Sequence, residues 1–396
     1  MMIAGRFLRA PYLAQLNLRR WLVGRYYGIR RKFPASAPAG ATVCIQAPER
    51  VLIIVCGLIG DSVMCTPVLE EARRIWPDAD ITLLGRKHNC DLFAACAYLD
   101  RIQEARALPF TISDRSIFAD LREWLADMHF DVAIILLGDD FAATVASLNI
   151  PVRVGSSGTL LEACLTHPFD CASPRTWGPD EKLNALRSLG FAVSGKIPHL
   201  WISDSARSTA RRMLSELGVG AGTRYAVLHP FGSEAGRWWP MDRTDELSLA
   251  LSNRHGLASI LVGGTQVRSS SLYRRSRYCV DTVGALDLSQ LLAVIEGAAV
   301  TITTDSGPYH IAGALRRPVV GLFRASRPEH ANRYPGASAV LGHDRDCSGR
   351  CGWDRCRRDP CREMFNITVP DILGMIDRIS SLFQTPDCPS PRTVVK

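Results

Sequence analysis

The sequence of 396 residues contains no uninterrupted apolar run of the ~20 residues that a membrane-spanning helix needs. It also lacks the apolar core of a signal peptide. Pro11, Gln15, Asn17 and Arg19 interrupt the apolar stretch nearest the N-terminus. These absences exclude a membrane span and a secretion signal as interpretations of that stretch.

The cysteines do not form the even, regularly spaced set of a disulfide scaffold. There are 13, an odd number, and most are scattered through predicted helices and strands. This indicates reduced thiols in a cytoplasmic protein. Four cluster late in the chain, namely Cys347, Cys351, Cys356 and Cys361. Four close thiols could hold zinc or an iron–sulfur centre, but paired C-x2-C motifs are missing, so a reduced or disulfide-capable loop is the alternative.

Acidic residues are absent before Glu49, although the whole chain has a net charge of +8. Residues 1–47 instead mix basic residues with apolar and aromatic ones. The basic residues are Arg6, Arg9, Arg19, Arg20, Arg25, Arg30, Arg31 and Lys32. This mixture predicts an amphipathic helix that contacts an anionic membrane surface, followed by a linker at 35–40. The alternatives are a poorly ordered basic leader and a helix packed on the body of the protein.

The chain as a whole has the composition of a soluble globular protein, with 47% hydrophobic and 22% charged residues. Strand and helix patterns alternate from the apolar run at 51–55, and again from a second run at 225–229. This alternation predicts an α/β fold with two mostly parallel sheets. We expect domains at 48–200 and 201–368, the second including the cysteine-rich loop at 347–361. A closing helix and tail at 369–396 follow. The segment 168–222 looks like a connection with one helix at 205–217.

The stretch 303–315 indicates a binding site. A short β-branched strand precedes Asp305-Ser306-Gly307, and helical spacing of apolar residues follows it. The start of a helix presents unpaired N–H groups and a positive dipole end, which suit a phosphate. The alternative is an ordinary helix N-cap, because Asp and Ser are good capping residues.

Four spaced signatures make the chain, from about 50 to 382, resemble glycosyltransferase family 9, the ADP-heptose:lipopolysaccharide heptosyltransferases. They are Gly60-Asp61-Ser62-Val63 after the first strand, Leu228-His229-Pro230 with Arg237-Trp238-Trp239-Pro240, Leu261-Val262-Gly263-Gly264, and Asp305-Ser306-Gly307-Pro308-Tyr309-His310. The resemblance implies the GT-B fold, in which two Rossmann-like domains face each other across a cleft. The nucleotide sugar would lie mainly on the C-terminal domain and the acceptor on the N-terminal one.

The resemblance also implies roles for individual residues. Asp61, which follows Gly60, matches the general base that would deprotonate the acceptor hydroxyl and invert the anomeric centre. Arg237 and Ser233 match phosphate-contacting positions. Donor contacts are implied for Asp305, Ser306 and Gly307 and, more weakly, for His310, which we interpret first as a packing or hydrogen-bonding residue. Gly60 and Gln266 belong to the implied substrate-binding set as well. Two positions depart from the family pattern: Gln266 stands where many members carry a Glu that faces the donor ribose, and Leu58 replaces the small or hydroxylated residue common before the Gly-Asp pair.

We therefore expect a metal-independent, inverting glycosyltransferase without a cofactor. It would move a heptose from a nucleotide sugar such as ADP-heptose to a lipopolysaccharide core or other lipid-linked glycan. We expect it to act in the cytoplasm or peripherally on the cytoplasmic membrane face, with no nucleic-acid partner. Three alternatives are another nucleotide sugar or acceptor, a non-catalytic binding protein, and a dinucleotide-dependent oxidoreductase. Against the oxidoreductase, Gly57-x2-Gly60 lacks the full G-x-G-x-x-G motif.

Overall fold

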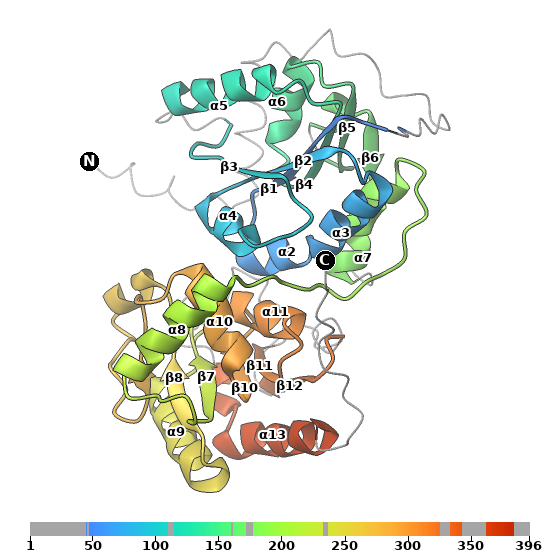
Figure 1. The fold of residues 1–396 in the computed structure, drawn as a ribbon. Helices are drawn as coiled ribbons and strands as arrows, with labels where there is room; N and C mark the ends of the chain where they lie inside the picture. The colour runs from blue at the N-terminus through green and yellow to red at the C-terminus, as the bar shows by residue number, and fades with distance from the viewer. Residues whose placement is uncertain are drawn as a thin grey trace, which may run out of the picture. The chain divides into compact units, whose positions relative to one another are not determined.

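The computed structural model shows two compact units, Met1–Lys196 and Ile197–Lys396 (Figure 1). The structure describes residues 45, 47–109, 115–159, 161–171, 177–232, 237–324, 333–342 and 362–383. Each unit has its own six-stranded sheet and its own apolar core. No helix in these ranges is long and apolar enough to cross a membrane.

The first unit is built on a parallel sheet with the strand order β3-β2-β1-β4-β5-β6. The strands are β1 (Arg50–Val55), β2 (Asp80–Gly85), β3 (Arg101–Glu104), β4 (Val132–Leu137), β5 (Val152–Ser156) and β6 (His167–Phe169). Five consecutive apolar residues of β1 are buried, because helices cover both faces of a central parallel strand. The predicted parallel α/β fold is therefore confirmed in this half.

Helices lie on both faces of the first sheet. They are α2 (Ile59–Val63), α3 (Thr66–Ile75), α4 (Lys87–Phe93), α5 (Arg115–Asp127), α6 (Phe141–Ser147), the 3-10 helix η3 (Glu162–Cys164) and α7 (Gly178–Arg187). Leu52 and Ile54 share one apolar cluster with side chains of α5 and α6. On the sheet, α3 and α7 lie side by side (Figure 1).

The second unit repeats the scheme, with the parallel strand order β12-β11-β10-β7-β8-β9. Its strands are β7 (Tyr225–His229), β8 (Ala258–Leu261), β9 (Val280–Asp281), β10 (Val300–Thr304), β11 (Val319–Arg324) and β12 (Ala337–Gly342). Read from β9 to β12, the third, second, first, fourth, fifth and sixth strands of this unit follow one another, which is the order of the first sheet.

The helices of the second unit also form two layers. They are α8 (Asp204–Glu216), α9 (Met241–His255), the 3-10 helix η5 (Thr265–Ser269), α10 (Leu288–Gly297), α11 (Gly307–Ala314), α12 (Arg362–Asn366) and α13 (Val369–Phe383). The core of this unit joins the sheet to α9 and α13. Helices α8, α10 and α11 pack together elsewhere in the unit, as Figure 1 shows.

The shared strand order places a topological switch point in each unit. After β1 the chain builds outward to β3 and then returns to β4 on the other side, and it does the same between β7 and β10. Ligands of open parallel sheets bind beyond the carboxyl ends of the strands at such points. Asp61 follows β1, and Asp305 follows β10.

One local prediction needs correction. The segment 168–222 contains β6 and α7 besides the predicted helix, because Pro179 occupies the first turn of α7 instead of breaking a helix. In the loop-to-helix region after β1, Asp61 lies within α2.

Candidate functional site

The switch point of the second unit carries an anion-binding arrangement of backbone groups. β10 ends at Thr304, Ser306 is extended (φ −157°, ψ 177°), and α11 begins at Gly307 with Pro308 in its first turn. Within the described part of the chain, the N–H groups of Ser306 and Gly307 have no hydrogen-bond partner. The structure thus confirms the predicted strand-to-helix junction and leaves donors there for a ligand.

Arg237 lies at this junction. Its Nη2 donates to the main-chain oxygen of Asp305 at 3.1 Å and to Asp305 Oδ2 at 3.3 Å. The side chains of Arg237 and Asp305 are only 12% and 17% exposed. The guanidinium is therefore held beside the first turn of α11.

A hydroxyl network that the sequence analysis missed supports the same turn. His229 Nδ1, at the end of β7, lies 3.3 Å from Thr303 Oγ1 and 3.2 Å from Ser306 Oγ. Burial lowers the pKa of His229 to about 4, so the ring is neutral at physiological pH. Both hydroxyls also donate to the main-chain oxygen of Thr304, at 3.0 Å each. The His229-Pro230 pair at the end of the strand could have indicated this network, but we interpreted it only as part of the family resemblance.

The other residues predicted to contact the donor sugar nucleotide include Gln266 in η5 and His310 in α11. Gln266 is exposed in η5, at the carboxyl end of β8. His310, one turn into α11, places Nδ1 3.3 Å from the Tyr334 hydroxyl and packs edge-on against Tyr309. Burial lowers the pKa of His310 to about 4. Ser233 lies outside the described residues, so its predicted phosphate contact stays a prediction.

In the first unit, Asp61 is the third residue of α2 and Gly60 the second. The N-cap position belongs to Leu58, which is 72% exposed, so Asp61 does not cap this helix. The Asp61 side chain is at the surface. Desolvation by the surrounding protein nevertheless raises its pKa above the ordinary value, and the Lys182 ammonium opposes this shift. A raised pKa makes a carboxylate a stronger base.

Lys182 is the second group that the sequence analysis missed. It lies on α7, in the segment that we interpreted as a connection, and its side chain is 12% exposed. Its Nζ donates to the main-chain oxygen of Leu136, near the end of β4, at 3.2 Å. No sequence pattern identifies this buried ammonium, because its burial depends on how α7 packs on the sheet.

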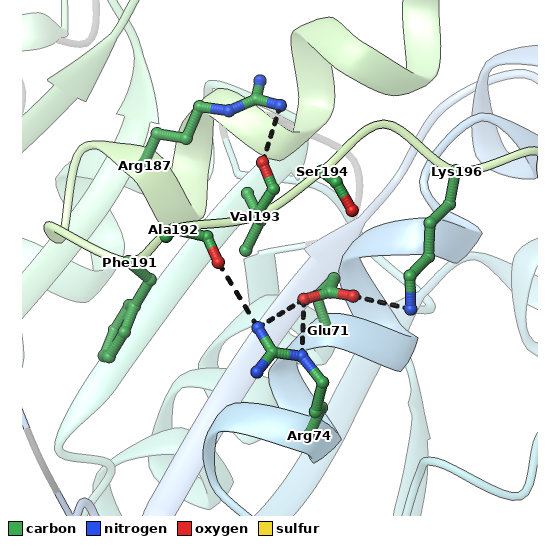
Figure 2. Close-up of a pocket in the computed structure, with 8 residues that line it drawn as sticks. All are labelled: Glu71, Arg74, Arg187, Phe191, Ala192, Val193, Ser194 and Lys196. Atoms are coloured by element: carbon green, nitrogen blue, oxygen red, sulfur yellow. Dashed lines mark hydrogen bonds and ion pairs between the residues drawn. The ribbon is translucent and has the colours of Figure 1, made fainter.

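A separate hollow of about 780 Å³ opens on the first unit between α3, α7 and the segment after α7 (Figure 2). It is lined by Glu71, Arg74, Arg187, Phe191, Ala192, Val193, Ser194 and Lys196. Its charged groups are already paired with one another or with main-chain oxygens, as the dashed lines in Figure 2 show. None of the predicted site residues lines this hollow.

The predicted cysteine cluster, Cys347, Cys351, Cys356 and Cys361, lies outside the described residues. Within the ranges that the structure covers, no three His, Cys, Asp or Glu side chains could together hold a metal ion. Seven cysteines in these ranges are free thiols.

Two Rossmann-like units of this kind form the GT-B fold, and solved structures with the same fold support this assignment. A family 9 glycosyltransferase from Veillonella parvula superposes with a TM-score of 0.70 at 19% identity, covering 87% of this chain and 100% of that one. ADP-heptose LPS heptosyltransferase II from E. coli gives 0.65 at 17% identity, covering 85% and 100%.

The sequence comparisons identify the family. The profile described as glycosyltransferase family 9 (heptosyltransferase) matches residues 119–355, and the chain belongs to this family. Lipooligosaccharide heptosyltransferase 2 of Haemophilus ducreyi is 30% identical over 311 residues, 71% of this chain and 85% of that protein. Lipopolysaccharide heptosyltransferase 3 of Escherichia coli is 23% identical over 338 residues, 81% and 96% of the two chains. The protein is therefore a glycosyltransferase, and the oxidoreductase alternative is wrong.

Proposed function

We propose that this protein transfers a heptose from a nucleotide sugar such as ADP-heptose to a lipopolysaccharide-core or other lipid-linked glycan. The names of the relatives support this proposal, since they are lipopolysaccharide or lipooligosaccharide heptosyltransferases. A solved structure of the same fold, E. coli heptosyltransferase WaaC, contains ADP-2-deoxy-2-fluoro heptose (TM-score 0.60, 18% identity).

One observation carries the donor assignment. The N–H groups of Ser306 and Gly307, which have no hydrogen-bond partner among the residues that the structure describes, lie at the start of α11 beside an Arg237 guanidinium anchored 3.1 Å from Asp305 O. Helix N–H donors next to a guanidinium form a site for a diphosphate. Such donors would also stabilise the negative charge that develops on the leaving diphosphate, so the proposed reaction is metal-independent.

The proposed reaction inverts the anomeric carbon. The acceptor hydroxyl attacks that carbon and passes its proton to the Asp61 carboxylate as the new C–O bond forms. The bond from the anomeric carbon to the diphosphate oxygen breaks, and its electron pair leaves with the diphosphate. Asp61 suits the role because its surroundings raise its pKa while it remains accessible at the surface.

Turnover of ADP-heptose by Asp61→Asn tests the proposal. ADP release should fall by roughly 10²–10⁴-fold, the usual contribution of a general base, whereas donor binding should persist. Donor binding is measured as thermal stabilisation by ADP-heptose and by a panel of other nucleotide sugars. Asp78→Asn, at an exposed position of the same unit, is the matched control and should keep full turnover.

Two results would contradict the proposal. Near-normal turnover by Asp61→Asn would remove Asp61 as the base. Stabilisation by a different nucleotide sugar, with none by ADP-heptose, would replace the donor, and a protein that binds a donor but never turns over would support the non-catalytic alternative. Full activity after EDTA treatment is expected, and loss that Mg²⁺ restores would contradict metal independence.

A further inference from the structure

The segment between β1 and the proposed base is tied to α4 by a buried asparagine. Asn89, in α4, is 0% exposed. Its Nδ2 donates to Gly57 O at 3.0 Å and to Ser62 Oγ at 2.8 Å. Gly57 precedes Asp61 in the sequence, and Ser62 follows it directly. One side chain from the helix after β2 therefore holds both ends of the segment that carries Asp61.

The partners fix the direction of each hydrogen bond in this network. Gly57 O can only accept, and the Arg86 N–H can only donate, to Asn89 Oδ1 at 3.0 Å. The amide nitrogen of Asn89 therefore faces Gly57. Ser62 Oγ donates its own proton to Leu58 O at 2.8 Å, so it accepts the second proton of Asn89 Nδ2. Both polar atoms of the Asn89 side chain are thus paired, as a buried amide requires.

A second side chain of α4 contacts the same carbonyl group. His88 Nε2 lies 2.8 Å from Gly57 O, and it carries a proton because a carbonyl oxygen can only accept. On the other side of the turn, a Cβ added to Gly57 would lie 2.6 Å from Leu137 Cδ1, so the main chain packs directly against the end of β4. Both α4 and β4 therefore fix the start of the turn.

The helix that contains Asp61 is too short to hold the carboxylate in place by itself. α2 has five residues, and isolated helices shorter than about 12–15 residues are marginal in water. Contacts from outside α2 have to stabilise it. Ser62 is 0% exposed, whereas the Asp61 side chain is at the surface, so the buried anchor of α2 lies next to the proposed base in the chain.

We propose that Asn89 is a positioning residue for Asp61, acting through Gly57 and Ser62 to fix the carboxylate for proton transfer from the acceptor hydroxyl. This inference rests on the proposed function, because it matters for turnover only if Asp61 is the base. A general base has to lie within hydrogen-bond reach of the proton that it removes, and a displacement of about 1 Å can cost about 10²-fold in rate.

Asn89→Leu tests the inference in the full-length protein, because it keeps the approximate volume of the side chain and removes both donors. It should lower kcat for ADP release by about 10–100-fold. Thermal stabilisation by ADP-heptose should persist, since the residues proposed to bind the donor lie in the second unit. Asn184→Leu is the matched control and should keep full kcat, because Asn184 Nδ2 joins α7 to Asp170 O at 3.0 Å instead of holding the turn. Unchanged kcat in Asn89→Leu overturns the inference.

The same substitution in Asp61→Asn separates positioning from general structural support. The base is already missing in that background, so Asn89→Leu should lower the residual turnover by less than about twofold. A purely structural role would lower turnover by the same factor in both backgrounds, and this result would overturn the inference.

Ser62→Ala takes the place of Asn89→Leu if that variant does not fold. It removes the acceptor of the second Asn89 hydrogen bond and deletes only a hydroxyl group. It should lower kcat in the protein that retains Asp61 and have little effect in Asp61→Asn. No loss in the first background, or an equal loss in both, would overturn the inference.

The two proposals fail in different ways. Full turnover by Asp61→Asn removes the proposed base, whatever Asn89→Leu shows. Strongly reduced turnover by Asp61→Asn together with full turnover by Asn89→Leu removes only the role of Asn89.

Discussion

The buried carboxylate of Glu71 gives a stability prediction whose size follows from the structure. Its side chain is 3% exposed, and its Oε2 accepts from Arg74 Nε at 2.8 Å. Its Oε1 lies 2.6 Å from Lys196 Nζ (Figure 2). Glu71→Gln keeps the shape and removes the charge, so one amide oxygen remains as an acceptor and the amide N–H₂ group has to face a cation.

Glu71→Gln should lower the free energy of unfolding by about 1–2 kcal/mol. A hydrogen bond to a charged group contributes about 1.5–3 kcal/mol and a neutral one about 1 kcal/mol. Solvent screens part of the difference because the Arg74 side chain is 56% exposed. For a unit of this size, each kcal/mol shifts Tm by about 2–4 °C, so Tm should fall by roughly 2–8 °C at pH 7.

The pH dependence gives a second check on the same variant. Burial by itself would raise the pKa of Glu71, but the hydrogen bonds and charges of Arg74 and Lys196 outweigh it, and the pKa is lowered. The folded protein therefore binds this proton less tightly than the unfolded chain does. The stabilisation should be fully present above the ordinary pKa of about 4.3 and lost as the pH falls through the lower folded-state pKa. The difference in Tm between wild type and Glu71→Gln should therefore disappear as the pH falls through the folded-state pKa of Glu71.

Glu70 is the matched control. It also pairs with Lys196, at 2.8 Å, but its side chain is 29% exposed. Exposed ion pairs contribute about 0–1 kcal/mol, so Glu70→Gln should lower Tm by less than Glu71→Gln. Thermal unfolding followed by circular dichroism from pH 7 to pH 3 measures both variants. Equal effects at pH 7, or a gap for Glu71→Gln that persists in acid, would refute the reasoning.

Three further predictions follow from particular residues. Arg237→Gln should weaken ADP-heptose binding by about 10–100-fold in calorimetry, because it removes a charge-assisted donor and leaves the Asp305 carboxylate beside the anion. Arg243→Gln, which removes a surface ion pair with Glu246, should leave ADP-heptose binding unchanged. If the two variants bind ADP-heptose with equal affinity, Arg237 does not contact the diphosphate. Gly342→Ala should destabilise the fold by more than about 3 kcal/mol in urea unfolding, since the methyl group would collide with the main-chain oxygen of Glu363. Gly374→Ala, a helical position with open space, should stabilise by about 0.5–1 kcal/mol, and similar values for the two would contradict the packing. Deleting residues 1–47 should release the protein from vesicles of anionic lipid in a sedimentation assay, because the deletion removes the basic leader; unchanged binding would mean that the leader is not the anchor.

The sequence predicted the helices and strands around the 303–315 stretch more accurately than those of the segment 168–222. The β-branched run of β10 and the helix-starting residues of α11 are strong local signals, and the structure has both elements where we predicted them. The segment that contains α7 was misinterpreted because its glycines and prolines resemble a linker. Pro179 is nevertheless compatible with a first helical turn, and Leu183 and Leu186 are fully buried, so tertiary packing stabilises this helix.

The sequence by itself determined the types of the main elements, the family of the protein and the strand-to-helix junction that begins α11. These follow from short-range periodicity and from motifs a few residues long. Only the tertiary structure decided which distant side chains meet. Arg237 and Asp305 are 68 positions apart, yet they lie in contact because the sheet pairs β7 with β10. Lys182 Nζ reaches the main-chain oxygen of Leu136 because α7 packs against β4. Strand pairing and burial set such contacts, and both depend on the whole unit folding together, which no local pattern records.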